Sequence, residues 1–149
     1  MYHKILVALD NSPADESLIP HVAALAAVHH SHLLLLHVAD GFAARNFDQL
    51  KLAESEEMKA DRAYLERLAV QLIAQGLQVT THLALGEPPA EILKTAEREQ
   101  CDLIAMTTHG HRFLYDVLIG STIDKVRHES DIPLLVVRAA AKRTEKTRD

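Results

Sequence analysis

Short apolar runs alternate along the chain with longer segments in which apolar residues recur every three to four positions. The runs "KILVALD" and "HLLLLHVAD" are almost continuously apolar, which is typical of strands buried on both faces of a parallel sheet. The longer segments have the period of amphipathic helices. The pattern predicts strands at 4–10, 32–40, 77–85, 101–108 and 132–138, and helices at about 13–28, 54–75, 88–100 and 121–128.

Strands and helices that alternate in this way predict an α/β fold with a mostly parallel sheet covered on both sides. The third strand alternates apolar and polar residues, as a partly exposed edge strand does. Ser12 is the expected N-cap of the first helix, with Pro13 as its first residue and Asp15 as the acid of a capping box. Gly76 is the expected terminator of the second helix.

The 149 residues are enough for one domain with a substantial core, and we assign residues 1–139 to it and 140–149 to a flexible tail. The net charge of −5 argues against a nucleic-acid surface, which needs clustered positive charge. No apolar run is long enough to span a membrane. The single cysteine, Cys101, excludes an internal disulfide, fits a reducing cytoplasm and is expected to be buried.

Candidate chemistry lies after the fourth strand, where Gly110 stands in a loop and Gly120 precedes Ser121. Ligands of parallel sheets bind beyond the carboxyl ends of the strands, at the point where the strand order reverses. A helix that began at Ser121 would offer unpaired N–H groups and partial positive charge to a phosphate. Ser121 with Asp124 is also the pattern of a simple helix cap, so capping alone remains an alternative.

Gly110, nine residues and then Gly120-Ser121 resemble the nucleotide signature of the universal stress protein family, Gly-x-x-Gly, nine residues, Gly-Ser/Thr. The resemblance extends along the chain: "ILVALDNS" and "LLLLHVAD" are similar to the family's first two strands, and "GSTIDKVRHESDIPLLVVR" to its closing segment. It implies a Rossmann-like, doubly wound, five-stranded parallel sheet of order 3-2-1-4-5 with four helices. It also implies a homodimer and an adenine nucleotide as ligand, ATP or another, with Mg²⁺ as a candidate ion.

The resemblance also implies roles for single residues. Ala8 and Val38 match positions that contact the adenine, and Asp10 matches an acid near the ribose. The phosphate-binding positions are Gly110, Gly120 and Ser121, and Thr122 is a candidate second hydroxyl.

Two positions depart from the family pattern. Thr107 replaces the first glycine of the signature; its Cβ could crowd the ribose or a phosphate, and its hydroxyl could instead form a substitute hydrogen bond. After Gly110 come His111 and Arg112, and Arg112 could reach a phosphate or remain a surface residue.

The last strand, with Pro133 to Val137 at its centre, is apolar throughout and lies at an edge in the family's strand order. An exposed apolar edge favours pairing with another chain, so we expect a two-fold homodimer through this strand.

The histidines and the known catalytic motifs give no further site. His29, His30 and His32 diverge from one another, so we expect no metal site there, and His37 is expected to be a satisfied core histidine. No Gly-x-Ser-x-Gly elbow and no Lys-bearing phosphate loop occur. No well-placed general base or metal-binding acid cluster is visible, so we expect no efficient hydrolase and, from the resemblance, a cytoplasmic nucleotide-binding regulator. Slow ATP hydrolysis and a non-nucleotide-binding dimeric interaction module remain as alternatives.

Overall fold

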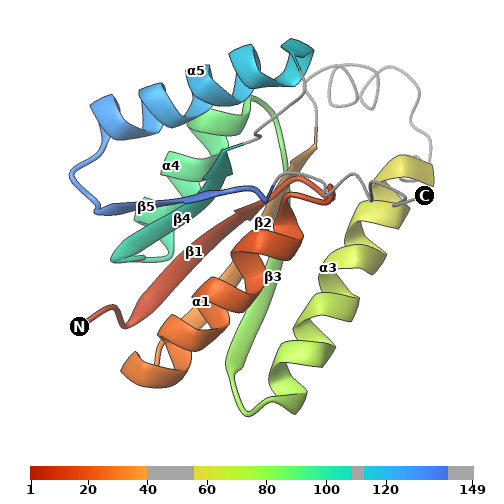
Figure 1. Cartoon of the computed structure of the whole chain (residues 1–149), viewed down its shortest axis with the longest axis vertical. Helices are drawn as coiled ribbons and strands as arrows, with labels where there is room; N and C mark the ends of the chain where they lie inside the picture. The colour runs from red at the N-terminus through yellow and green to blue at the C-terminus, as the bar shows by residue number, and fades with distance from the viewer. Residues whose placement is uncertain (40–55, 109–112, 141–149) are drawn as a thin grey trace, which may run out of the picture.

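The computed structural model describes residues 1–39, 56–108 and 113–140, and for 113–120 it describes the backbone alone. Within these ranges five strands alternate with four helices along the chain (Figure 1). The strands are β1 (Lys4–Leu9), β2 (His32–Ala39), β3 (Gln78–Leu85), β4 (Leu103–Thr108) and β5 (Leu134–Arg138). The helices are α1 (Asp15–His29), α3 (Glu56–Ala74), α4 (Pro88–Arg98) and α5 (Phe113–Glu129).

The strands form one parallel sheet of order β3-β2-β1-β4-β5, as the resemblance implied. The central strand is β1, with Leu9 opposite His37 of β2 and Val7 opposite Ala105 of β4. From β1 the chain adds strands first toward β3 and then, after a reversal, toward β5. The reversal point lies between the carboxyl ends of β1 and β4, which is where ligands of such sheets bind.

Two helices cover each face of the sheet, α1 with α3 on one side and α4 with α5 on the other (Figure 1). Alternation along β1 divides its side chains between these layers. Ile5 and Val7 pack with α1 and α3, whereas Leu6 packs with α4 and α5. All three are fully buried, and burying each contributes about 1.5–3 kcal/mol to stability.

Most predicted boundaries agree with the structure to within a few residues. Gly76 ends α3 with a φ of +89°, a conformation that glycine adopts without steric cost, and its N–H donates to the carbonyl of Ile73. Pro88 is the first residue of α4, where its missing N–H costs no hydrogen bond. Strand β3 lies at an edge of the sheet as predicted.

The predicted N-cap of α1 is wrong by two residues. The helix begins at Asp15 with Ala14 as its N-cap, and no side chain caps it there. Ser12 instead closes a turn ahead of the helix, because its carbonyl accepts from the Asp15 N–H (3.0 Å) and its hydroxyl from the Ala14 N–H (3.3 Å).

The predicted start of the last helix is also wrong. Helix α5 begins at Phe113, not at Ser121, so Gly120 and Ser121 lie inside it. The segment "FLYDVLI" contains no proline, and one internal glycine costs a helix only about 1 kcal/mol, so neither prevents a helix from running through Gly120. The glycine therefore does not mark a helix end here.

Cys101 is buried, as expected, with 6% of its surface exposed. Burial raises the pKa of its thiol to about 11, so the side chain is an uncharged core residue.

The expected tail, 140–149, lies outside the described residues except for Ala140. The N–H of Ala140 donates to the Ser17 hydroxyl on α1 at 3.0 Å. None of the helices in the described ranges has the length and apolar character needed to cross a membrane.

Candidate functional site

The candidate site lies at the carboxyl ends of β1, β2 and β4. Ala8 on β1 and Val38 on β2 are half-buried and pack on the same face of the sheet, toward α4 and α5. Asp10 follows β1 directly and is exposed. Three of the residues predicted to bind the nucleotide therefore lie together at the ends of two neighbouring strands.

The turn between β1 and α1 has a defined shape. Asn11 has a φ of +57°, a left-handed conformation that asparagine tolerates better than most residues. The Ser12 hydroxyl donates a 2.6 Å hydrogen bond to Oδ1 of Asp10, which fixes that exposed carboxylate. The turn thus presents the Asp10 side chain from a short, internally bonded segment.

A buried carboxylate, Asp15, holds this turn from behind. Its Oδ1 accepts from the Asp10 N–H at 3.3 Å, and its Oδ2 accepts from the Asn11 N–H at 2.9 Å. The Tyr64 hydroxyl on α3 donates to the same Oδ2 at 2.6 Å. Asp15 is only 2% exposed, and burial raises its pKa to about 6, although the bond from Tyr64 opposes the rise.

A second pair of buried polar groups extends this arrangement to β2. Asp61 on α3 accepts from the Asn11 amide at 3.0 Å with Oδ1, and its Oδ2 lies 3.2 Å from Nε2 of His37. Nδ1 of His37 lies 2.8 Å from the carbonyl of Leu9. A carbonyl only accepts, so Nδ1 carries a hydrogen, and the bond between Nε2 and Asp61 needs one further proton between them. His37 is thus a satisfied core histidine, as predicted.

We call Asn11, Asp15, His37, Asp61 and Tyr64 the clamp network, because together they fasten α3 and β2 to the β1–α1 turn. Burial also raises the pKa of the Tyr64 hydroxyl, so this group stays a hydrogen-bond donor at all ordinary pH.

A groove of about 510 Å³ borders the turn on the side of α1 and α3. The residues that line it include Asn11, Ser12, Asp15, Ile19, Tyr64 and Leu68. Of the predicted nucleotide-binding residues whose side chains the structure describes, none lines this groove. The predicted site and the groove therefore meet only at the turn.

The predicted phosphate end is only partly described. Gly110 and Arg112 lie outside the described residues, and Gly120 is known only as a backbone position within α5. Ser121 is exposed and Thr122 is half-buried on the same helix. Because Ser121 is inside α5, its hydroxyl is the group available to a ligand, and the predicted helix N-terminus with its Ser-x-x-Asp cap is wrong.

Thr107 is buried, with 7% of its surface exposed. Ala105, two residues earlier on β4, packs with the α1 layer. Met106, the residue directly before Thr107, packs with the α5 layer. By alternation the Thr107 side chain lies on the α1 side, opposite to Ala8 and Val38.

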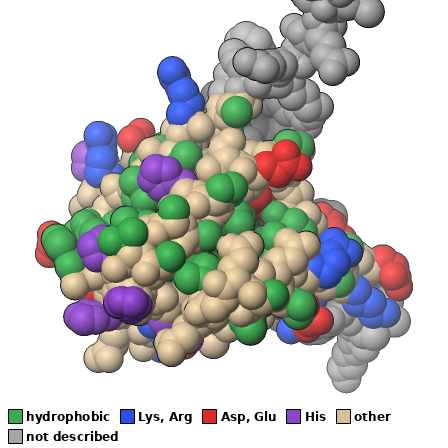
Figure 2. Space-filling model, turned by 60° about the horizontal axis from the view of Figure 1, so that its bottom comes forward, with side chains coloured by type: hydrophobic (Ala, Val, Ile, Leu, Met, Phe, Trp, Pro, Cys, Tyr) green, Lys and Arg blue, Asp and Glu red, His purple; other side chains and the backbone are tan. Residues whose placement is uncertain are grey.

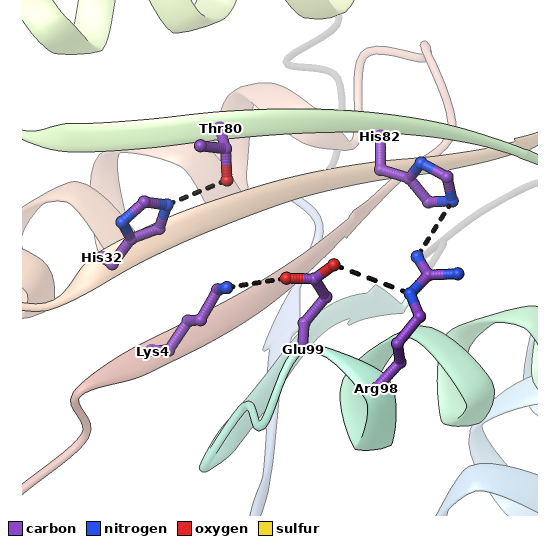
Figure 3. A network of polar contacts seen from close by, with 6 residues as sticks. All are labelled: Lys4, His32, Thr80, His82, Arg98 and Glu99. Carbon is purple, nitrogen blue, oxygen red and sulfur yellow. Dashed lines mark hydrogen bonds and ion pairs between the residues drawn. The ribbon is translucent and has the colours of Figure 1, made fainter.

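A separate polar network lies on the α4 side of the sheet, between its amino-terminal half and the end of α4 (Figure 3). Lys4 pairs with Glu99 at 2.9 Å, and Arg98 lies 3.6 Å from the same carboxylate and 3.4 Å from Nε2 of His82. A guanidinium only donates, so Nε2 of His82 accepts and the imidazole is neutral. Burial lowers the pKa of His82, which agrees with a neutral ring.

Figure 2 shows histidine side chains on the left half of the face in view, among hydrophobic side chains. His32 is bonded to Thr80 at 2.8 Å. Within the described parts of the chain, no group of three or more His, Cys, Asp or Glu side chains is arranged to hold a metal ion.

Sequence reasoning missed most of the clamp network. One signal was present: Asp61 stands on the apolar stripe of α3, between the buried Met58 and Leu65, where a charged residue needs a partner. The partners themselves, Asn11 and His37, come from distant parts of the sequence.

Comparison with known proteins agrees with this architecture. Universal stress protein MJ0577 of Methanocaldococcus jannaschii is 32% identical over 93% of this chain and 96% of its own length. The solved structure of MJ0577 superposes with a TM-score of 0.78 at 31% identity, over 94% of this chain and 98% of that one.

Two more distant solved structures carry ligands. One is a universal stress protein in complex with cAMP (18% identity, TM-score 0.67, 93% of this chain and 98% of that one). The other is the universal stress protein from Archaeoglobus fulgidus in complex with dAMP (18% identity, TM-score 0.67, 91% and 98%). At this identity they show a shared fold. The sequence pattern of the universal stress protein family matches residues 1–138, and this chain therefore belongs to that family.

Proposed function

We propose that this protein binds an adenine nucleotide, with ATP as the expected ligand, and acts as a regulator in a cytoplasmic stress response. The observation that carries the proposal is the position of Asp10. Its carboxylate is exposed at the end of β1, at the reversal point of the sheet, and is fixed there by the Ser12 hydroxyl. The complexes of two family members with cAMP and dAMP support an adenine nucleotide as ligand.

In this proposal the adenine lies against Ala8 and Val38, which share one face of the sheet, and Asp10 accepts hydrogen bonds from the ribose. A ribose hydroxyl donates well to a carboxylate, and such charge-assisted bonds are short and strong. Thr107 is buried on the other face, so it would border the ligand with its backbone and would not obstruct the adenine.

The phosphates would extend toward the segment after β4 and toward α5. Gly110, Arg112 and Gly120 are the proposed backbone and cationic contacts, and the hydroxyls of Ser121 and Thr122 are the proposed side-chain donors. Mg²⁺ would enter with the phosphates of ATP, because Mg²⁺ is usually held by substrate phosphates and few protein groups.

The test starts from freshly purified protein. The protein is denatured and the supernatant is separated on a nucleotide column; we expect ATP, ADP or AMP. Thermal shifts with ATP and Mg²⁺ are then measured for the wild type, Asp10→Ala and Ser121→Ala. Ser130→Ala is the matched control, since the Ser130 hydroxyl accepts from the Ile132 N–H between α5 and β5, ahead of the amino end of β5.

We expect a shift for the wild type and the control and a reduced shift for the two site variants. If neither released nucleotide nor a thermal shift is found with the wild type, nucleotide binding is wrong. Phosphate release above background that Ser121→Ala abolishes would add slow hydrolysis to the function.

A second candidate function is that of a dimeric interaction module without nucleotide. Two observations favour it: Thr107 stands where the family signature has glycine, and β5 is an edge strand whose Val136 is 40% exposed. In either case we propose a homodimer in which the segment from Pro133 to Val137 pairs with its copy.

A further inference from the structure

The clamp network connects ionisable side chains to the β1–α1 turn, and this turn carries Asp10. The Asp15 carboxylate touches the turn at two backbone N–H groups, those of Asp10 and Asn11. The same carboxylate receives the Tyr64 hydroxyl, and Asn11 is also bound to Asp61. The carboxylates of Asp15 and Asp61 thus connect the turn to α3.

We propose that Asp15 is a proton-dependent positioning residue: ionised, it holds the β1–α1 turn in the shape that binds nucleotide, and protonated, it releases that shape. The inference rests on the proposed nucleotide function and deepens it, because it predicts that acidification weakens binding through this protein's own side chain.

The chemistry of the carboxyl group gives the direction. An ionised carboxylate only accepts, and the structure places three donors around it, two N–H groups and one O–H. Protonation converts one oxygen into a donor, which accepts less well from the N–H and O–H groups already there and can instead donate to the Asp10 side chain, a hydrogen bond that favours the protonated form. It also removes the charge that makes these bonds about twice as strong as neutral ones.

The surroundings of Asp15 bring its protonation into the pH range of ordinary buffers. Tyr64 on α3, Asp10 in the turn and the neighbouring Glu16 face this part of the structure, and Asp61 and His37 lie beyond Asn11. Burial raises the pKa of Asp15 to about 6, and the negative charge of Asp10 raises it as well. The hydrogen bonds from the Tyr64 hydroxyl and from the Asp10 N–H oppose this rise.

The first arm of the test needs no nucleotide. The backbone amide signals of Asp10 and Asn11 are followed by nuclear magnetic resonance between pH 4.5 and 8 in the intact protein. We expect both to titrate with a midpoint near pH 6 in the wild type and to show no such step in Asp15→Asn. In Tyr64→Phe the midpoint moves to higher pH, because the bond that stabilises the ionised form is lost.

The second arm measures the Kd for ATP over the same pH range in the same variants. The ligand's own titration is common to all, so the ratio of the variant's Kd to that of the wild type isolates Asp15. We expect Asp15→Asn to bind about tenfold more weakly than the wild type at pH 7.5, a factor that corresponds to one charge-assisted bond. We expect the two Kd values to converge below pH 5.

Asp131→Asn is the matched control, because Asp131 is exposed in the connection that precedes β5, away from the turn. It should follow the wild type in both arms. Circular dichroism at each pH verifies that the variants are folded.

The outcomes separate this inference from the proposed function. If the wild type binds ATP but its turn amides do not titrate, or the Kd ratio is constant with pH, the role of Asp15 is wrong and nucleotide binding stands. If the wild type binds no nucleotide at pH 7.5, the proposed function is overturned and the coupling falls with it, whatever the amides show.

Discussion

The Tyr64 hydroxyl on α3 donates a 2.6 Å hydrogen bond to the buried carboxylate of Asp15, which lies 49 residues earlier in the chain. This bond ties the start of α1 to the second helix of the same layer. It also leaves a carboxylate that is 2% exposed with donors but with no cation among its described partners. A buried charge that is only hydrogen-bonded is costly to keep, and this cost can be measured.

The stability of the protein should therefore depend on Asp15 and pH in a specific direction. Its pKa is raised from the ordinary 3.8 to about 6 in the folded protein, so the folded state binds this proton more tightly than the unfolded state. The stabilisation is complete below pH 3.8 and is lost as the pH rises through 6. Asp15→Asn does not titrate, so between pH 4.5 and 7.5 the wild type should lose about 2 kcal/mol relative to it.

Urea unfolding at several pH values measures this difference. The two free energies of unfolding must diverge as the pH rises, whereas curves that stay parallel contradict the raised pKa. Asp131→Asn, an exposed aspartate, should stay parallel to the wild type.

The pair of His37 and Asp61 should be strongly coupled. His37→Leu leaves the Asp61 carboxylate, 7% exposed, without its Nε2 partner and the Leu9 carbonyl without its donor. We expect a loss of about 3 kcal/mol in the free energy of unfolding. The double variant with Asp61→Leu should lose less than the sum of the two single variants.

The matched control for this pair is His82→Leu. His82 is a half-buried strand histidine with only a 3.4 Å contact to Arg98, so its loss should change stability by less than about 1 kcal/mol. Equal losses for the two histidine variants would mean that the bonds of His37 to Asp61 and Leu9 contribute no extra free energy of unfolding.

Glycine substitutions should separate backbone strain from steric contact. Gly86 has a φ of +144°, and a Cβ there would lie 3.0 Å from Oε1 of Glu91. Gly76 has a φ of +89° with nothing within 4 Å of such a Cβ. We expect Gly76→Ala to cost about 1 kcal/mol and Gly86→Ala about 2 kcal/mol or more, measured by thermal or urea unfolding. Adding Glu91→Ala to Gly86→Ala should recover only the part due to the contact; full recovery would mean that strain plays no role.

The proposed dimer predicts that a charge on β5 disrupts association. Val136 is 40% exposed on this edge strand, and lysine on an edge prevents pairing with another strand. Light scattering after size exclusion should give a dimer for the wild type and a monomer for Val136→Lys. Val28→Lys on α1, where valine is 74% exposed, should remain a dimer. A wild type that is monomeric at high concentration would refute the edge pairing.

The sequence predicts the layers of this fold well, because they depend on local patterns. Continuous apolar runs locate β1 and β2, and Gly76 and Pro88 mark helix ends through their own backbone restrictions. The predicted start of α5 is wrong because a glycine need not mark a helix end: one internal glycine costs about 1 kcal/mol, and α5 runs through Gly120.

The candidate site was predictable only in part. Asp10, Ala8 and Val38 follow from strand ends and resemblance, and the topology brings them to one edge of the sheet. The clamp network depends on contacts between β1, β2 and α3, and no local pattern encodes which polar residue meets which. Asp61 within an apolar stripe indicates that a partner exists, but its identity needs the tertiary structure.

The bonds from Asn11 to Asp61 and from Asp15 to Tyr64 close loops of 50 and 49 residues. Closing such loops costs chain entropy, so contacts of this range form late in folding. Because β1 and α1 precede α3 in the chain, we expect that they can form and pack together before the turn between them acquires its final shape. The turn that presents Asp10 would then reach its final shape only after Asp61 and Tyr64, 50 and 49 residues beyond their partners, have folded against it.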